Sequence, residues 1–272
     1  MEAQKLGNHM AVAVSGLDIG RPTDPATQGA LRQLLNDNLV LCISGQTLTP
    51  VPFRDAMARF GTPVKRLQLE HTPECDEVNI ISSEDRDVLG DGKKLVNGAS
   101  WHTDDSFMRQ PCSLTMLYGV TIPSTGGDTQ FVNMYAAYDA LSPAMKARIE
   151  GLQVIHKYQS SRQVNRVSRR PESEMKAMPE ATHPLVKVHP ETGRKALYLN
   201  ANRMEQIVGL ERGESDRLLD ELIAHAIKPE FQYRHVWRKG DVVIWDNRCT
   251  MHKANADYPE GERRLMHRVV VA

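Results

Sequence analysis

The chain has 272 residues, and its 34 basic and 34 acidic side chains give a formal net charge of zero. This balance gives no general attraction for nucleic acid or an anionic membrane, so neither is an expected partner, whereas small anionic ligands need only local charge. The four cysteines form no CxxC pair, which favours free thiols in a reducing compartment (Cys42, Cys75, Cys112 and Cys249). The sequence shows no secretory pattern and no apolar run near the ~20 residues of a membrane span, so we predict a cytoplasmic protein.

Caps, apolar spacing and turn residues predict the elements of the first half. Asp24 and Pro25 suit the start of a helix over residues 23–38. The other predicted elements are, in chain order, a strand at 39–44, a helix at 52–60, strands at 77–82, 113–120 and 128–133, and two helices at 134–141 and 143–150.

The second half is predicted to be rich in strands, at 152–157, 185–189, 196–200, 231–237, 241–246 and 266–271. Ser215 is predicted to cap an amphipathic helix with an apolar stripe that includes Leu218 and Leu222. Residues 158–182 are polar and rich in Arg, Ser and Glu, which is typical of a long surface excursion and compatible with a lid.

Many short strands with few helices indicate a mainly β fold, with a closed or sandwiched β-core and flanking helices. A doubly wound α/β sheet fits less well, because strands and helices do not alternate along the chain. No Gly/Ser run, Pro-rich stretch or charge block marks a linker, so residues 1–272 are predicted to form one domain.

A short His-x-Asp pattern, His102-Thr103-Asp104, is the first candidate for metal chemistry. In an extended strand, residues i and i+2 point to the same face, so the imidazole and the carboxylate would enter one space. His252, from a distant strand, would complete two histidines and one carboxylate, a set typical of ferrous oxygenases. On its own the pattern is more often a strand histidine bonded to a neighbouring carboxylate than a metal site.

Three further residues are candidates for binding anions. Thr129 ends a Gly-Gly-Asp-Thr turn and could turn its hydroxyl towards a carboxylate. Arg264 and Arg268 lie in or just before the apolar segment LMHRVVVA, and their even spacing places both on one face. Burying two arginines is costly unless each meets an anion, which internal carboxylates or two anionic ligands would supply.

In combination, the segments WHTD, GGDT, WDNRCTMHKANADY and RRLMHR closely resemble the TauD/TfdA family of Fe(II)- and 2-oxoglutarate-dependent dioxygenases. The resemblance implies a double-stranded β-helix, a cupin-like jelly roll, with Fe(II) as cofactor and 2-oxoglutarate and O2 as co-substrates. It implies that iron is bound by His102, Asp104 and His252, the distal carboxylate of 2-oxoglutarate by Thr129 and Arg264, and the primary substrate by Arg268 and His71.

The C-terminal half is more similar to aryloxyalkanoate dioxygenases than to taurine dioxygenase. A carboxylic acid hydroxylated beside an ether oxygen and then cleaved is therefore the first expectation, and alkylsulfonates, sulfate esters and amino-acid-derived metabolites are the alternatives. Substrate choice would depend on residues 85–100, Phe107, Met108 and the 158–182 excursion.

Two classes outside oxygen chemistry stay open at this point. One is a zinc-binding jelly roll or hydrolase, because two histidines and a carboxylate also suit zinc. The absence of an obvious general base in these motifs argues against it. The other is a non-catalytic binding module. Oligomeric state is not readable from the sequence, so a homo-oligomer stays an alternative to a monomer.

Overall fold

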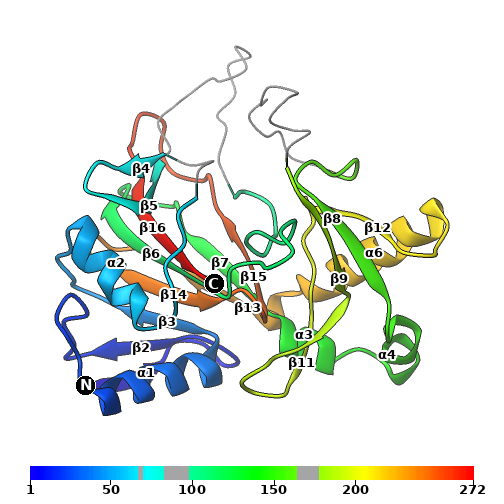
Figure 1. Cartoon of the computed structure of the whole chain (residues 1–272), viewed down its shortest axis with the longest axis horizontal. Coiled ribbons are helices and arrows are strands. Elements are labelled where there is room, and N and C mark those ends of the chain that lie inside the picture. The colour runs from blue at the N-terminus through cyan, green and yellow to red at the C-terminus, as the bar shows by residue number, and fades with distance from the viewer. Residues whose placement is uncertain (67–69, 83–97, 164–177) are drawn as a thin grey trace.

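The computed structural model describes residues 1–66, 70–82, 98–163 and 178–272 (Figure 1). Its strands form one large sheet and three small ones. Within the large sheet, β2 and β3 are parallel, and the other neighbouring strands are antiparallel. No helix in the described ranges is long and apolar enough to span a bilayer.

The large sheet has the order β1-β2-β3-β14-β6-β16-β5-β4. Its strands are β1 Glu2–Lys5, β2 Val12–Ser15, β3 Val40–Ile43, β14 Val242–Asp246, β6 Leu114–Thr121, β16 Leu265–Val271, β5 Cys75–Ser82 and β4 His71–Thr72. The small sheets are β13-β7-β15 (Gln232–His235, Thr129–Asn133, Thr250–Ala254), β12-β8-β9 (Met204–Ile207, Gln153–Lys157, Glu180–Pro184) and β10-β11 (Val186–Val188, Lys195–Leu197).

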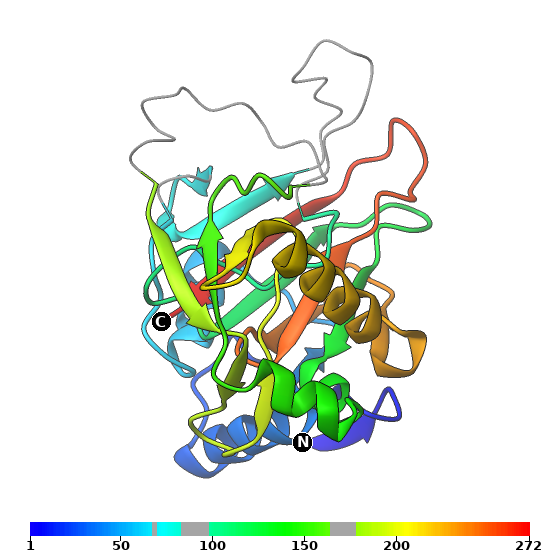
Figure 2. The ribbon, with the colours of Figure 1, turned by 90° about the vertical axis from the view of Figure 1, so that its right-hand side faces the viewer.

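The helices are α1 Pro25–Asn38, α2 Pro50–Ala58, α3 Met134–Asp139, α4 Pro143–Ile149 and α6 Arg212–Ala226, with the 3₁₀ turn η1 Pro229–Phe231. In Figure 1, α1 and α2 lie beside the large sheet, whereas β8, β9, β12 and α6 lie beyond the β13-β7-β15 sheet. Figure 2, seen from that second side, shows α6 crossing the front of this part of the molecule.

Strand β14 shows why a central strand of the large sheet can be apolar at four consecutive positions, Val242 to Trp245. Val242 and Ile244 pack in one buried cluster with residues of α1 and α2, such as Leu35. Val243 and Trp245 pack in a second cluster with Phe131 of the small β13-β7-β15 sheet. Because both faces of the large sheet are covered, the polar half of the usual two-residue alternation is lost. The mainly β prediction, with a sandwiched core and flanking helices, is therefore confirmed.

Local capping signals gave one confirmed prediction and one wrong one. Asp24 is the N-cap of α1, and its Oδ1 accepts a hydrogen bond from the amide of Thr27 at 2.9 Å. Ser215 does not cap α6, because the helix begins at Arg212, three residues earlier, with Glu211 as its N-cap residue. The Ser215 hydroxyl is instead buried and accepts a hydrogen bond from the amide of Ile207 at 2.8 Å, which ties α6 to β12.

Several predicted boundaries are wrong. Helix α2 begins at Pro50 rather than Pro52 and ends at Ala58 rather than Phe60. The excursion over 158–182 is only partly a loop, because β9 begins at Glu180 and pairs with β8. Residues 164–177 of that excursion, and 85–97 of the proposed substrate-sensing loop, lie outside the described residues.

Candidate active site

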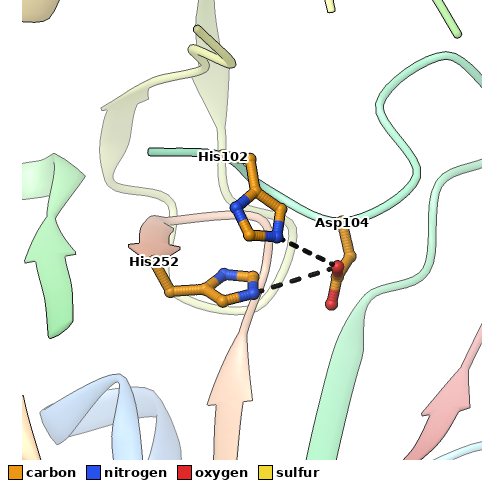
Figure 3. A group of neighbouring side chains, drawn as sticks. All are labelled: His102, Asp104 and His252. Carbon is orange, nitrogen blue, oxygen red and sulfur yellow. Dashed lines mark ion pairs between the residues drawn. The ribbon is translucent and has the colours of Figure 1, made fainter. Parts of the chain in front are cut away.

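The three predicted metal ligands converge at one point (Figure 3). His252 lies in the middle of β15, and an isolated β-bridge pairs it with His102 through backbone hydrogen bonds of 3.0 and 2.7 Å. The ring centroids of the two imidazoles are 4.1 Å apart. Oδ1 of Asp104 lies 3.7 Å from Nε2 of His102 and 3.9 Å from Nε2 of His252. One donor atom from each residue lies within 4.8 Å of the other two, so the trio could hold a metal ion.

His102 and Asp104 converge, but the prediction that they do so by alternation along an extended strand is wrong. His102 belongs to a single bridge, not to a continuous strand, and Asp104 starts a turn. Asp105 follows with φ at 55°, a left-handed conformation that is uncommon for residues other than glycine. The carboxylate therefore reaches the imidazoles through a turn rather than through strand alternation.

Hydrogen bonding fixes which nitrogen of His102 can bind a cation. Nδ1 lies 2.7 Å from the carbonyl oxygen of Ser100. A carbonyl can only accept, so Nδ1 carries the proton and Nε2 presents its lone pair towards Asp104. A backbone carbonyl that orients an imidazole in this way is a common outer partner of a metal ligand.

Electrostatics give the trio the protonation states that a metal site needs. Burial is the main cause that lowers the pKa of His102 and, more strongly, that of His252, so both imidazoles are neutral at neutral pH. Burial alone would raise the pKa of Asp104, but the charge of Arg268 and the nearby imidazoles outweigh it and lower that pKa well below its usual range. Two neutral imidazoles and one ionised carboxylate are a suitable donor set for a divalent cation.

A network that the sequence did not predict holds the Asp104 carboxylate in place. Thr115, on β6, donates its hydroxyl to Oδ2 of Asp104 at 2.6 Å. Asn247 donates to the Thr115 hydroxyl at 2.9 Å and accepts from the Asp104 amide at 3.3 Å. Thr103 also donates its hydroxyl to the carbonyl of Asn247 at 2.7 Å. The signal for Asn247 was its place in WDNRCTMH, close to His252, but no spacing rule connects it to Asp104.

Thr129 and Arg264 lie at the predicted Gly-Gly-Asp-Thr turn. Thr129 is buried, and its hydroxyl oxygen accepts from Nε1 of Trp237 at 2.9 Å, which leaves the hydroxyl proton available to donate. Arg264 is also buried, and its Nε donates to the carbonyl of Gly127 at 2.9 Å. Burial lowers the pKa of Arg264 to about 10, so this side chain stays charged at neutral pH. A buried cation beside a hydroxyl donor suits one carboxylate group.

A salt-bridge clamp, which no sequence motif predicted, holds that turn. Asp257 accepts from the amide of Gly127 at 2.9 Å and pairs with Arg234 at 2.7 Å. Arg234 also pairs with Asp128, at 2.5 Å. Gly126 has φ at 70°, and a Cβ there would overlap the carbonyl oxygen of Asp257. The clamp therefore fixes the backbone carbonyl that orients Arg264.

The two residues predicted to contact substrate lie in different settings. The Arg268 side chain, on β16, is 13% exposed, and its Nη2 lies 3.1 Å from Oδ2 of Asp104. His71, on β4, pairs in register with Asn79, which in turn pairs with Arg268, so both lie on the same side of the sheet. The His71 side chain is 40% exposed, and its Nδ1 lies 3.4 Å from the exposed carboxylate of Asp76.

Two further arginines, which the sequence motifs did not indicate, lie near the three proposed metal ligands. Arg66 pairs with Asp105 at 2.5 Å, directly beside Asp104. Arg203 stacks on the ring of Tyr158, and that ring packs edge-on against Phe107 at a centroid distance of 5.1 Å. Neither arginine stands in a recognisable motif, so only the folded chain reveals that they border the site.

Comparison with known proteins agrees with this geometry. The family model described as taurine catabolism dioxygenase TauD, TfdA family, matches residues 2–270. The chain is 32% identical to the alpha-ketoglutarate-dependent 2,4-dichlorophenoxyacetate dioxygenase of Cupriavidus pinatubonensis, over 95% of this chain and 93% of that protein. It is 31% identical to the alkylsulfatase of Acinetobacter baylyi, over 100% of this chain and 85% of that one.

A solved structure of AAD-2, in complex with Mn(II) and N-oxalylglycine, is also similar. It matches with a TM-score of 0.85 and 31% identity, over 100% of this chain and 96% of that chain. The fold of these dioxygenases is the cupin-like jelly roll predicted from the sequence, so that prediction is confirmed. The chain belongs to the TauD/TfdA family, and it is an alpha-ketoglutarate-dependent dioxygenase that uses Fe(II), 2-oxoglutarate and O2 and acts on a small molecule.

Proposed function

We propose that His102, Asp104 and His252 bind the iron and that the enzyme hydroxylates a C–H bond of a small anionic substrate. The observation that carries the proposal is that one donor atom from each of these three residues lies within 4.8 Å of the other two. The lone pair of His102 Nε2 is not used in a hydrogen bond and is therefore available to a metal ion. When bound, Fe(II) would activate O2, which is the oxidant, and 2-oxoglutarate would supply two electrons and leave as succinate and CO2, so that one oxygen atom enters succinate and the other enters the C–H bond of the substrate. Asp104 takes the position that a halide would need, so we expect hydroxylation rather than halogenation.

Thr129 and Arg264 are the proposed anchor for the distal carboxylate of 2-oxoglutarate. The buried guanidinium supplies charge and the hydroxyl supplies a second donor, which together suit a planar, two-oxygen acceptor. Gly127 and its clamp hold Arg264 in place before 2-oxoglutarate arrives. Preorganised donors of this kind orient the co-substrate at little entropic cost.

For the primary substrate, we propose a carboxylic acid of the aryloxyalkanoate type, hydroxylated beside its ether oxygen and then cleaved. Relatives named as 2,4-dichlorophenoxyacetate and (S)-phenoxypropionate dioxygenases support this class. A relative named alkylsulfatase and one named as a putative sulfonate dioxygenase support the sulfate-ester and sulfonate alternatives. An amino-acid-derived metabolite stays a further alternative. Arg268 is the proposed contact to the anionic group, and a contact to His71 stays a prediction.

The test begins with anaerobic addition of Fe(II) and 2-oxoglutarate, which should produce a weak visible charge-transfer band. Release of succinate is then measured with aryloxy acids, alkylsulfonates, sulfate esters and N-acyl amino acids. Stimulation by aryloxy acids would support the proposed class, and stimulation by another class alone would replace it. A metal-replete protein that gives neither band nor succinate would favour the zinc-binding alternative.

Four broader statements complete the proposal. We propose that residues 1–272 form one dioxygenase domain, which the family match over 2–270 supports. A cytoplasmic location, a lack of nucleic-acid and membrane partners, and the choice between monomer and homo-oligomer stay predictions. Size-exclusion chromatography with light scattering would decide the last of these.

A further inference from the structure

The arginines around the metal trio differ in how their charge is balanced. Arg268 pairs with Asp104 at 3.1 Å, and Arg66 pairs with Asp105 at 2.5 Å. Arg203 has no carboxylate within ion-pair distance among the described residues, and its Nη1 is buried without a hydrogen-bond acceptor there. An enclosed guanidinium nitrogen without an acceptor is costly, so a missing acceptor is expected beside it.

Arg203 is held rigidly at this position. Its carbonyl accepts from the amide of Lys157, at the end of β8, at 2.8 Å, and its amide donates to the carbonyl of Asn200 at 3.2 Å. The guanidinium carbon lies 4.3 Å from the ring centroid of Tyr158 and 5.7 Å from that of Phe107. A cation stacked on aromatic rings keeps its N–H groups pointing outward from the ring edge, ready to bind an acceptor.

Arg203 also lies close to the metal trio. The residues just before Arg203 run beside the segment that leads to His102: Ala201 donates its amide to the carbonyl of Trp101 at 3.0 Å, and Asn202 donates to the hydroxyl of Ser100. An anion bound to Arg203 would therefore be within reach of the reacting centre.

We propose that Arg203 binds the anionic group of the primary substrate, with the rings of Tyr158 and Phe107 forming the wall beside it. This inference rests on the proposed function and refines it, because Arg268 already gives one of its donors to Asp104. The group recognised is one with at least two anionic oxygens, as in a carboxylate, a sulfonate or a sulfate ester. Arg268 then contacts the same anionic group only through those N–H groups that do not already donate to Asp104.

The test compares Arg203→Met, which keeps an unbranched side chain but removes the charge, with Arg203→Lys and with Arg109→Met. Arg109 is an exposed arginine two residues after Phe107 and serves as the matched control. The probes are 2,4-dichlorophenoxyacetate, an alkyl sulfate, an alkylsulfonate and an N-acyl amino acid, each beside an uncharged analogue such as the amide or the alcohol. Binding is read anaerobically from the change that each probe causes in the charge-transfer band, and KM and kcat from succinate release.

For the anion that wild-type protein accepts, Arg203→Met should weaken binding and raise KM roughly 10- to 100-fold, with little change in kcat. Arg203→Lys should recover part of this loss, and Arg109→Met should behave as wild type. The affinity for 2-oxoglutarate and for uncharged analogues should not change. A purely structural role would instead lower the thermal midpoint and weaken charged and uncharged probes alike.

The possible outcomes distinguish failure of the proposed function from failure of the proposed role of Arg203. Absence of the band in wild-type protein would refute the proposed function itself. A normal band with unchanged anion binding in Arg203→Met would refute only the role of Arg203. A normal band in wild-type protein that binds none of the four anions would also refute it, because the site would then not select anions. The preferred probe distinguishes carboxylates from sulfur oxyanions.

Discussion

Among the residues that the structure describes, two groups of three neighbouring side chains each combine a histidine and an aspartate within metal-binding distance, and they differ in which donor atoms are already used in hydrogen bonds. The first is His102, Asp104 and His252. The second is His189, Asp246 and Cys249, at the end of β14. Residue type and proximity alone would make both of them candidate metal sites.

In the second cluster every donor is already used. Nδ1 of His189 accepts from two backbone amides at 3.2 Å, so Nε2 carries the proton that it donates to Asp246 at 3.0 Å. Arg248 covers both oxygens of the Asp246 carboxylate. Burial raises the pKa of the Cys249 thiol well above its usual value, so no thiolate is offered. This cluster therefore ties loops together, and no lone pair points into a shared space.

The first cluster has the opposite arrangement, because the Nδ1–H group of His102 donates a hydrogen bond to the carbonyl of Ser100 and the lone pair of Nε2 stays unused. The comparison teaches that a metal site is recognised by unused lone pairs, not by the count of histidines and carboxylates. Four variants would break or sharpen this contrast.

The largest effect is expected for Asp104→Ala. Removing the carboxylate takes away one proposed ligand and leaves Arg268 without its partner, so succinate release coupled to substrate should fall to background. Metal content of the folded protein, measured after dialysis against a weak chelator, should fall in parallel. Full coupled activity in this variant would remove Asp104 from the ligand set.

The matching change in the other cluster, Asp246→Ala, should act on stability instead. It leaves the half-buried guanidinium of Arg248 with Glu191 as its remaining partner and the buried ring of His189 without its acceptor, which should cost about 3 kcal/mol of unfolding free energy. Denaturant titration measures this loss, with Asp37→Ala, an exposed helix position, as the control. The folded fraction should still bind one metal ion, and loss of metal without loss of stability would contradict the contrast.

Arg264→Ala should raise the KM for 2-oxoglutarate roughly 10- to 100-fold, because a charged partner of its carboxylate is lost. The KM for the primary substrate should change much less. Steady-state kinetics with each compound varied in turn would show the split, and Arg264→Lys should recover part of the loss. The reverse ranking would overturn the assignment of Arg264 and Arg268 to different ligands.

The smallest effect is expected for Asp257→Asn, which weakens the clamp on Gly127 without touching the site directly. Loss of the charge that pairs with Arg234 should loosen the turn and raise the KM for 2-oxoglutarate roughly 2- to 10-fold. Titration of the charge-transfer band gives the same affinity without turnover. An equal loss for the primary substrate would indicate general disorder rather than a specific effect on Arg264.

The sequence predicted the sandwiched core well, because apolar runs such as that of β14 need two covered faces wherever they occur. It missed β1, β2, β4, β9 and β12, which are short strands of two to five residues, and it placed His252 on a strand without giving the bounds of β15. It also placed the start of α6 at Ser215, since a serine before an apolar stripe is a cap in most contexts. A buried contact to β12 decided otherwise.

For the site, the sequence by itself determined the donor types: two imidazoles, one carboxylate, and arginines near the end of the chain. Only the tertiary structure decided which lone pairs stay unused, that Asp104 reaches them through a turn, and that Arg268 pairs with Asp104 whereas Arg203 has no carboxylate partner among the described residues. The physical reason is that side-chain chemistry is local to each residue, whereas protonation, burial and charge balance depend on neighbours that lie far away along the chain.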